Sequence, residues 1–211
     1  MKTIKQYTLR YISSILACTV IMFTLLGCNN KDKTQTRTIN VAQQDDNSEA
    51  ITGEEIIWHV KAIHPDGKIL DVKALDKTGN IFDIKAIQYT EQTSLMDVKA
   101  LIDGRKVPVK VLVREDKYLP VKAVKDDGTI LDIKALTSDG KKLDVKGVSQ
   151  SGNIINIKAV TENGEFYGIE AISPKGWIND IKGVKMFKDP VEAIINGVEV
   201  YAHIKALTQT Y

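Results

Sequence analysis

Gly67-Lys68-Ile69-Leu70-Asp71-Val72-Lys73-Ala74-Leu75 is the stretch that decides the fold, and residues 128–136 repeat it almost letter for letter. Leu70, Val72 and Ala74 alternate with polar residues. A period of two indicates a β-strand with one buried face rather than a helix. Valine and isoleucine, which suit a pleated surface, dominate the buried positions.

The same phrase recurs along the chain with a period close to twelve residues. Its lysine position falls at residues 61, 73, 85, 99, 110, 122, 134, 146, 158, 170, 182, 192 and 205, with glutamate at 170 and 192. These thirteen copies fill residues 56–211. We therefore predict one β-hairpin repeat domain over this range.

Short turns that end in glycine separate the copies. Examples are Pro65-Asp66-Gly67, Lys77-Thr78-Gly79, Asp126-Asp127-Gly128, Ser138-Asp139-Gly140, Gln150-Ser151-Gly152 and Glu162-Asn163-Gly164. Each fits a type I turn followed by a left-handed glycine, which is a three-residue hairpin loop. Asp103-Gly104 fits a two-residue turn. The turns predict consecutive antiparallel hairpins.

The turns also predict a register in which charges alternate. Asp71 then faces Lys61 on one side and Lys85 on the other, and Lys73 faces Asp83. A parallel solenoid would stack like charges in ladders, which is unfavourable. We predict an all-β fold, an up-and-down antiparallel meander of about 13 short strands folded as an open sandwich or a flattened barrel. No like charges are expected to adjoin in the row through Lys61.

The second charged row becomes acidic at its end. In the predicted register Glu170, Asp180 and Glu192 lie on adjacent strands, and His203 follows them. Oxygen ligands on neighbouring strands suit Ca²⁺, so these four residues are a candidate metal site. The alternative is that the acids are solvated or meet lysines such as Lys182 or Lys185. No other cofactor is expected.

The N-terminus has the three zones of an export signal. Lys2, Lys5 and Arg10 precede an apolar run that ends in Leu25-Leu26-Gly27-Cys28. A small residue before cysteine, after such a run, resembles a bacterial lipobox. We expect a signal peptide at residues 1–27, lipidation of Cys28 and a disordered tether over residues 28–55. An uncleaved anchor is the alternative.

Processing would change both thiol content and charge. Cys18 would leave with the signal and Cys28 would carry lipid, which excludes disulfides and thiolate sites. Removing three cations from 29 would leave 26 against 27 acids. A formal charge of −1 does not indicate a nucleic-acid partner.

The lipobox followed by Asp-Val-Lys-Ala copies resembles uncharacterised repeat lipoproteins of Gram-negative bacteria, a domain-of-unknown-function family. The resemblance covers the signal and nearly all of residues 56–211. It implies a lipid-anchored protein of the cell envelope, at the outer membrane, and it implies no activity.

Two classes of function follow. The first is a non-catalytic structural or binding module for an envelope protein or a glycan, since repeat folds offer broad surfaces. Candidate sugar-stacking aromatics are Trp58, Trp177, Tyr89, Tyr118, Tyr167 and Tyr201. The second is a cation-dependent enzyme or Ca²⁺-binding module that uses the acidic end. We expect a non-enzyme because catalytic constellations are otherwise lacking.

Overall fold

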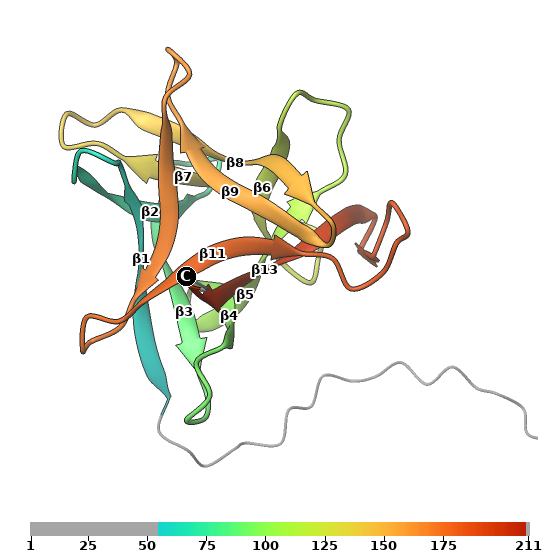
Figure 1. Ribbon diagram of the computed structural model, residues 1–211. Coiled ribbons are helices and arrows are strands. Elements are labelled where there is room, and N and C mark those ends of the chain that lie inside the picture. The colour runs from blue at the N-terminus through green and yellow to red at the C-terminus, as the bar shows by residue number, and fades with distance from the viewer. Residues whose placement is uncertain (1–54, 210–211) are drawn as a thin grey trace, which may run out of the picture. The chain divides into compact units, whose positions relative to one another are not determined.

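A computed structural model describes residues 55–209, which form thirteen β-strands (Figure 1). Their bounds are β1 Ile56–Ile63, β2 Ile69–Leu75, β3 Ile81–Gln88, β4 Leu95–Ile102, β5 Arg105–Leu112, β6 Leu119–Val124, β7 Ile130–Leu136, β8 Lys142–Ser151, β9 Ile154–Val160, β10 Phe166–Ile172, β11 Ile178–Val184, β12 Ala193–Ile195 and β13 Val198–Thr208. Within this range no helix is long and apolar enough to cross a membrane.

The predicted all-β antiparallel meander is confirmed. Every strand from β1 to β10 pairs with the strand that follows it, and all pairings are antiparallel. Hairpins joined by short turns therefore build the sheet, as the glycine spacing indicates. The parallel solenoid is excluded.

Pairings between strands that are distant in the sequence close the meander on itself. β1 pairs with β3, β6 with β8 and β9 with β11, while β13 pairs with both β4 and β5. Twelve strands thus form four groups of three mutually paired strands, which we call hubs. Hub 1 is β1, β2 and β3; hub 2 is β4, β5 and β13; hub 3 is β6, β7 and β8; hub 4 is β9, β10 and β11.

Six further pairings, which we call seams, join the hubs. They are β1–β10, β2–β7, β3–β4, β5–β6, β8–β9 and β11–β13. Each hub is joined once to each of the other three, which is the connectivity of a tetrahedron. Figure 1 shows the result, in which strands cross at several angles around a common centre and the turns point outward.

Each seam is centred on the lysine positions of two copies. Lys73 faces Lys134 and Lys85 faces Lys99. The same holds for Lys110 with Lys122, Lys146 with Lys158 and Lys182 with Lys205, whereas Lys61 faces Glu170. The expectation that no like charges adjoin was therefore wrong. The turns determine only the neighbours within a hairpin, and the seams bring together strands from different hairpins.

The seam geometry explains why, in most repeats, a large residue precedes the lysine and alanine follows it. When two lysines face each other across antiparallel strands, the residue before one faces the residue after the other. Val72 thus faces Ala135, and Ala74 faces Ile133. On its other side Ala74 faces Phe82 within hub 1. A small residue lies between two larger ones, which fills the interior without overlap.

Lysine–aspartate pairs lie within the hubs. Lys61 faces Asp71 and Lys73 faces Asp83, as predicted, and both lysines form ion pairs with these partners. The predicted pairing of Asp71 with Lys85 was wrong, because Lys85 faces His59 in the same hub. The β2–β3 hairpin diverges beyond Lys73, and β1 pairs with the separated parts of both strands.

The turn glycines adopt the expected conformation. Gly67, Gly79, Gly128, Gly140 and Gly164 have φ values of 81–93°, in the left-handed region. The prediction for residues 150–152 was wrong, because β8 continues to Ser151, which faces Ile154 across a two-residue turn. A register shift between Gly147 and Ser149 accompanies the shorter loop. Such a bulge restores the faces that a one-residue change in loop length would invert.

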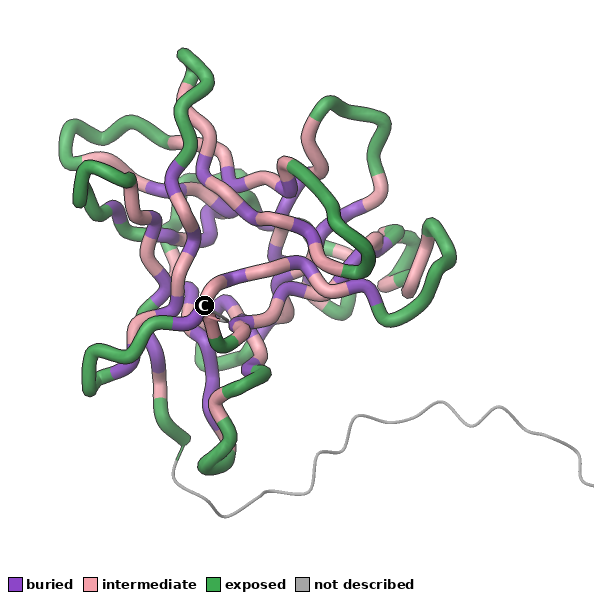
Figure 2. The backbone as a smooth tube through the Cα atoms, in the orientation of Figure 1, coloured by how far each residue is buried: buried purple, intermediate pink, exposed green. Residues whose placement is uncertain are grey.

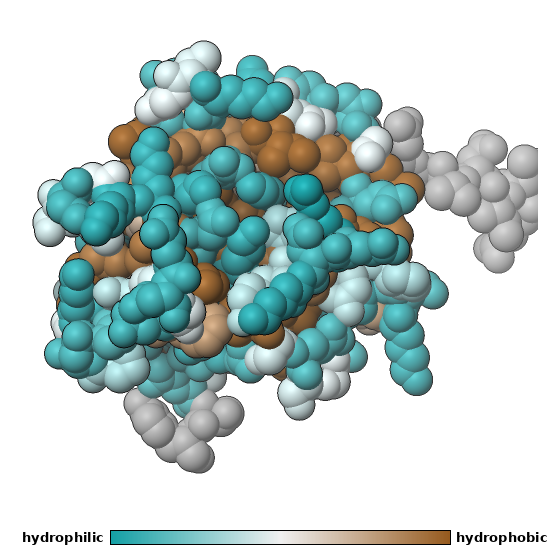
Figure 3. Space-filling view, turned by 90° about the horizontal axis from the view of Figure 1, so that it is seen from above, coloured by the Kyte–Doolittle hydropathy of each residue, from teal (hydrophilic) through white to brown (hydrophobic). Residues whose placement is uncertain are grey.

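Burial follows the strand centres, and exposed residues gather at the turns (Figure 2). One large cluster of valine, alanine, isoleucine and leucine side chains forms the core, with Trp58 fully buried in it. On the face seen in Figure 3, hydrophilic side chains lie over this layer, and the hydrophobic residues show between them. This face over the strands is therefore largely hydrophilic.

The segment between β11 and β13 departs from the repeat. β12 has only three residues and pairs with β13 alone, through an Asn196-Gly197 turn. The copy predicted around residue 192 is thus an inserted hairpin outside the four hubs. It packs against the end of β5 and β6 in a second, small apolar cluster.

Candidate functional site

The predicted lipidation site, Cys28, lies outside the described residues. The same holds for the signal and nearly all of the tether. The candidate metal ligands Glu170, Asp180, Glu192 and His203 are all described, and the structure separates them into two pairs.

Glu170 and Asp180 face each other on β10 and β11. Burial, followed by the charge of Asp180, raises the pKa of Glu170 above its ordinary value. Asp180 has partners of its own, an ion pair with Lys182 at 3.1 Å and a hydrogen bond from Gln209 at 3.0 Å. The acidic pair is thus neutralised in part by a neighbouring lysine.

Glu192 lies elsewhere, with a side chain that is fully buried. Its Oε1 accepts hydrogen bonds from the backbone N–H groups of Met186 and Phe187, at 2.5 and 2.8 Å. Lys185 lies 3.9 Å from the same oxygen and is itself only 5% exposed. The Lys185 ammonium also donates to the carbonyls of Asp189 and Tyr201. This buried ion pair holds the inserted loop on β13.

His203 connects Glu192 to a lysine of β5. Its Nε2 lies 3.4 Å from Glu192 Oε2, and its Nδ1 lies 2.6 Å from the Nζ of Lys110. Burial, followed by Lys110, lowers the pKa of His203. Burial, followed by the charges of Lys99 and Lys205, lowers the pKa of Lys110 to about 8. The imidazole of His203 therefore contacts a carboxylate through one ring nitrogen and an amine through the other.

The expected row of three acids was wrong, and residues 55–209 contain no group of three or more His, Asp or Glu placed to hold a metal ion. Glu192 precedes the inserted β12, and β11 pairs instead with β13. The Oε1 atom of Glu192 accepts hydrogen bonds from two backbone N–H groups, and its Oε2 atom lies 3.4 Å from His203. We therefore do not retain Glu192 and His203 as metal ligands.

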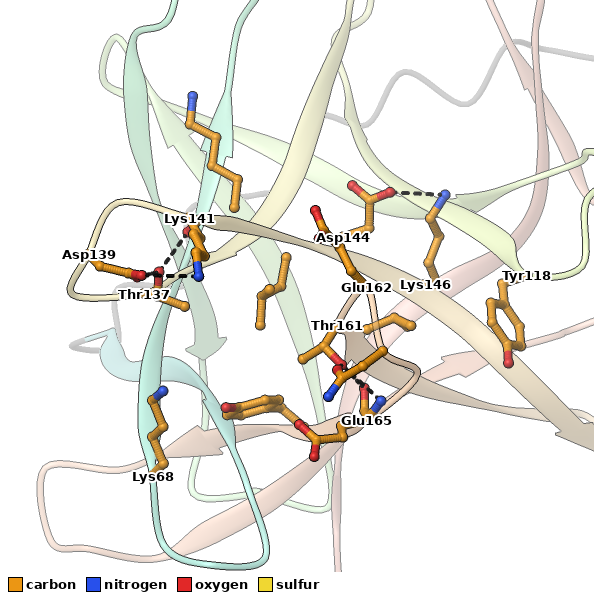
Figure 4. A pocket seen from close by; sticks show the side chains of 15 residues that line it. Lys68, Tyr118, Thr137, Asp139, Lys141, Asp144, Lys146, Thr161, Glu162 and Glu165 are labelled. Carbon is orange, nitrogen blue, oxygen red and sulfur yellow. Dashed lines mark hydrogen bonds and ion pairs between the residues drawn. The ribbon is translucent and has the colours of Figure 1, made fainter.

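A groove of about 840 Å³ opens between the β7–β8 turn and the β9–β10 turn (Figure 4). Eleven of its fifteen lining residues are charged or polar, two are tyrosines and two are aliphatic. They are Lys68, Tyr118, Thr137, Asp139, Lys141, Lys142, Leu143, Asp144, Lys146, Val160, Thr161, Glu162, Asn163, Glu165 and Tyr167. Four lysines balance four acids, so the groove has no strong net charge.

The groove's polar side chains are held by local contacts. Lys141 and Lys146 lie 3.4 and 3.5 Å from Asp139 and Asp144, and Thr161 donates to Asn163. Figure 4 shows these groups at the rim, with Lys68 and Tyr118 at separate sides of the opening. Positively and negatively charged groups, with further hydrogen-bond donors and acceptors, thus line a surface that also includes two tyrosine rings.

The six candidate aromatics divide by burial. Trp58 belongs to the core and donates from Nε1 to Gln88 at 2.9 Å, whereas Trp177 is 59% exposed. Tyr118 and Tyr167 line the groove of Figure 4. Tyr201 lines a second pocket, of about 340 Å³, with Phe187, and Tyr89 lies under Lys106. The aromatics therefore do not form one platform.

Sequence reasoning named Lys182 and Lys185 as lysines that the acids could meet, and they do form ion pairs, with Asp180 and Glu192 respectively. It missed Lys110. Lys110 occupies an ordinary lysine position, and only the seam and hub pairings show that it meets His203. It also missed the inserted hairpin, although Asn196-Gly197 is a strong signal for a hairpin turn. This turn indicates an inserted hairpin, and hence a loop over residues 185–192.

The fold and these sites define the class of protein: an all-β antiparallel domain with a polar groove on its surface. A family model described as a family of unknown function (DUF7486) matches residues 54–207, and the chain belongs to that family. The expected membership of a domain-of-unknown-function family is confirmed. No curated protein and no solved structure matches the chain.

Proposed function

We propose that this chain is a non-catalytic lipoprotein of the cell envelope, anchored through Cys28, whose β-domain binds an envelope glycan in the groove of Figure 4. The observation that carries the proposal is the groove itself. A volume of about 840 Å³ lies within the range of ligand sites, roughly 300–1,000 Å³.

The chemistry of the groove favours a glycan over an apolar ligand. Sugars present many hydroxyl groups that both donate and accept hydrogen bonds, and the groove offers lysine, threonine, asparagine and carboxylate groups. Tyr118 supplies a partly exposed ring at the rim, packed edge-on against Phe166 at 6.1 Å. An aromatic ring beside polar groups is suited to a ligand that has both apolar and polar faces.

The proposed location in the cell envelope is based on the sequence. A basic start, an apolar run and Leu-Leu-Gly-Cys28 support lipidation and export. Cys28→Ala is expected to abolish incorporation of a clickable fatty acid and release the protein from the membrane fraction. Equal labelling of the variant and the parent would contradict the anchor.

Binding can be measured by co-sedimentation of the full-length chain with purified peptidoglycan and with outer-membrane glycan fractions. Tyr118→Ala is expected to weaken binding. Tyr89→Ala is the matched control, because a lysine lies over each ring, at 5.0 Å for Tyr118 and 5.4 Å for Tyr89, yet Tyr89 lies outside the groove.

Retention of binding by Tyr118→Ala, or equal loss in both variants, would contradict the groove as the site. Crosslinking in intact envelopes tests the competing ligand. Capture of one stoichiometric protein, with no glycan bound, would favour a protein partner instead.

A further inference from the structure

Lys110 lies on the outer face of β5, opposite His203 of β13. Its Nζ is 2.6 Å from His203 Nδ1. An ammonium group only donates hydrogen bonds, so Nδ1 accepts and the ring hydrogen of the neutral imidazole lies on Nε2. The imidazole is therefore oriented to receive a proton from Lys110.

Glu192 lies behind the imidazole. Its Oε2 is 3.4 Å from His203 Nε2 and is the buried side-chain atom without a hydrogen-bond partner in the described part of the chain. Buried polar atoms are rarely left unpaired, and an exception calls for an explanation. A proton moved from Lys110 to His203 would place an imidazolium beside this carboxylate, which would stabilise it.

Charged groups of both signs surround Lys110, and Asp132 forms an ion pair with Lys122, but Lys99 and Lys205 act on Lys110 more strongly than Asp97 and Glu192 do. Lys99 and Asp97 belong to β4, Lys205 to β13, and Lys122 faces Lys110 across the seam to β6. Asp97 forms ion pairs with both Lys99 and Lys205. Burial and the lysines hold the pKa of Lys110 at about 8. An anionic group would be attracted to this part of hub 2.

Hub 1 contains a related lysine–histidine pair, which has no counterpart of the buried Glu192 beside the histidine. Lys85 lies 3.2 Å from His59 Nδ1, and it also forms an ion pair with Asp83 at 3.2 Å. The charged groups that affect His59 are Lys85, Lys61, Asp83 and Asp71, all within the same hub. Lys85 is therefore an internal control for the contribution of Glu192.

We propose that Lys110 is a nucleophilic amine, assisted by His203 and Glu192, that captures an aldehyde bearing an anionic group as an imine. This site is separate from the groove of Figure 4, and the proposal does not depend on the groove's ligand.

The step balances without an oxidant or a reductant. The deprotonated Lys110 amine attacks the carbonyl carbon with its nitrogen lone pair, while His203 takes one N–H proton and passes it to the carbonyl oxygen. The C–N bond forms, and the carbonyl oxygen becomes the hydroxyl of a carbinolamine. That hydroxyl then leaves as water with the one remaining amine hydrogen, which yields the imine.

The experiment uses the full-length chain at pH 8 with limiting pyridoxal 5′-phosphate, an anionic aldehyde. Borohydride reduces the imines, and peptide mass spectrometry gives the rate at each lysine. A group with a pKa of about 8 is half deprotonated at this pH. An ordinary lysine, with a pKa of about 10.4, is less than about 1% deprotonated. Because neither Lys85 nor Lys122 has a histidine backed by a buried carboxylate, Lys110 is expected to react at least about tenfold faster than either.

Two variants test the assisting groups. General-base assistance is worth roughly 10²- to 10⁴-fold, so His203→Gln should slow reaction at Lys110 by at least about tenfold. His59→Gln is the matched control and should leave the Lys110 rate unchanged. If thermal melting shows that His203→Gln does not fold, Glu192→Gln replaces it, since its amide oxygen can still accept the two backbone N–H groups.

Equal rates at Lys110 and Lys85 would overturn the proposal. An unchanged Lys110 rate in the folded His203 or Glu192 variant would overturn the assisted mechanism. Pyridoxal without the phosphate should lower the ratio of the Lys110 rate to the Lys85 rate, since this ratio cancels the intrinsic reactivity of each aldehyde, and an unchanged ratio would overturn the preference for an anionic aldehyde.

Discussion

At the scale of single residues, the alanine of each copy is as constrained as the larger core residues. Ala74, Ala86 and Ala135 are completely buried. Ala86 faces Trp58 within hub 1 and Val98 across a seam. A side chain larger than a methyl group would meet a neighbour on both sides.

Ala74→Leu is therefore expected to destabilise the domain by about 1–3 kcal/mol, the usual cost of overpacking. Urea denaturation of the purified chain measures the change. Lys77→Leu, in the exposed turn beside it, should change the free energy of unfolding by less than about 0.5 kcal/mol. Equal effects would show that Ala74 is not confined as described.

The hub aspartates predict the response to acid. The hydrogen bond from Lys61 lowers the pKa of Asp71, and the hydrogen bond from Lys73 lowers the pKa of Asp83. A carboxyl whose pKa is lower in the folded state stabilises the fold above its unfolded pKa of about 3.9. That contribution is lost as the pH falls through the folded value.

The urea concentration at the midpoint of unfolding should accordingly decrease as the pH is lowered below about 4. Asp83→Asn should be less stable than the parent at pH 6 and closer to it at pH 2, because the parent's carboxylate is then protonated. A constant difference between the two proteins at all pH values would contradict this origin.

At the scale of elements, two turn glycines with similar φ values differ in how much free energy of unfolding their replacement by alanine should cost. Gly79 has a φ of 93° with open space around its missing Cβ. Gly128 has a φ of 81°, and a Cβ there would lie 2.8 Å from the carbonyl oxygen of Asn196. The inserted β12–β13 hairpin, which donates from Asn196 to the Asp127 carbonyl, creates this close approach.

Gly79→Ala should cost about 1–2 kcal/mol, the penalty of a left-handed alanine. Gly128→Ala should cost more, since the Asn196 backbone must also move. Thermal melting of the two variants measures the difference. A Gly128 variant no less stable than the Gly79 variant would contradict the packing of the inserted hairpin on this turn.

At the scale of the whole molecule, the seams convert a meander into a closed arrangement of four hubs. Lys73 and Lys134 are 61 residues apart in the sequence and face each other directly. Facing residues of antiparallel strands have Cα atoms about 4.5–5.5 Å apart, a separation that a disulfide can bridge.

A chain carrying Lys73→Cys and Lys134→Cys, with Cys18 and Cys28 replaced by alanine, is expected to form an internal disulfide. A mobility shift on non-reducing gels, reversed by reductant, detects it. Lys73→Cys with Lys182→Cys is the control, because the β2–β7 and β11–β13 seams share no hub. Equal crosslinking of both pairs would contradict the arrangement of the seams.

The sequence alone determined most of the strands, the turns and the pairing next to them, except at residues 150–152 and in the inserted hairpin, because alternation and glycine conformation act over a few residues. It therefore predicted the meander and the pairs Lys61–Asp71 and Lys73–Asp83. The seams were not predictable in this way: near-identical strands offer many equivalent partners, and only the joint closure of all four hubs selects among them. The meeting of Lys110, His203 and Glu192 depends on that closure and on the inserted hairpin, so only the tertiary structure decided it.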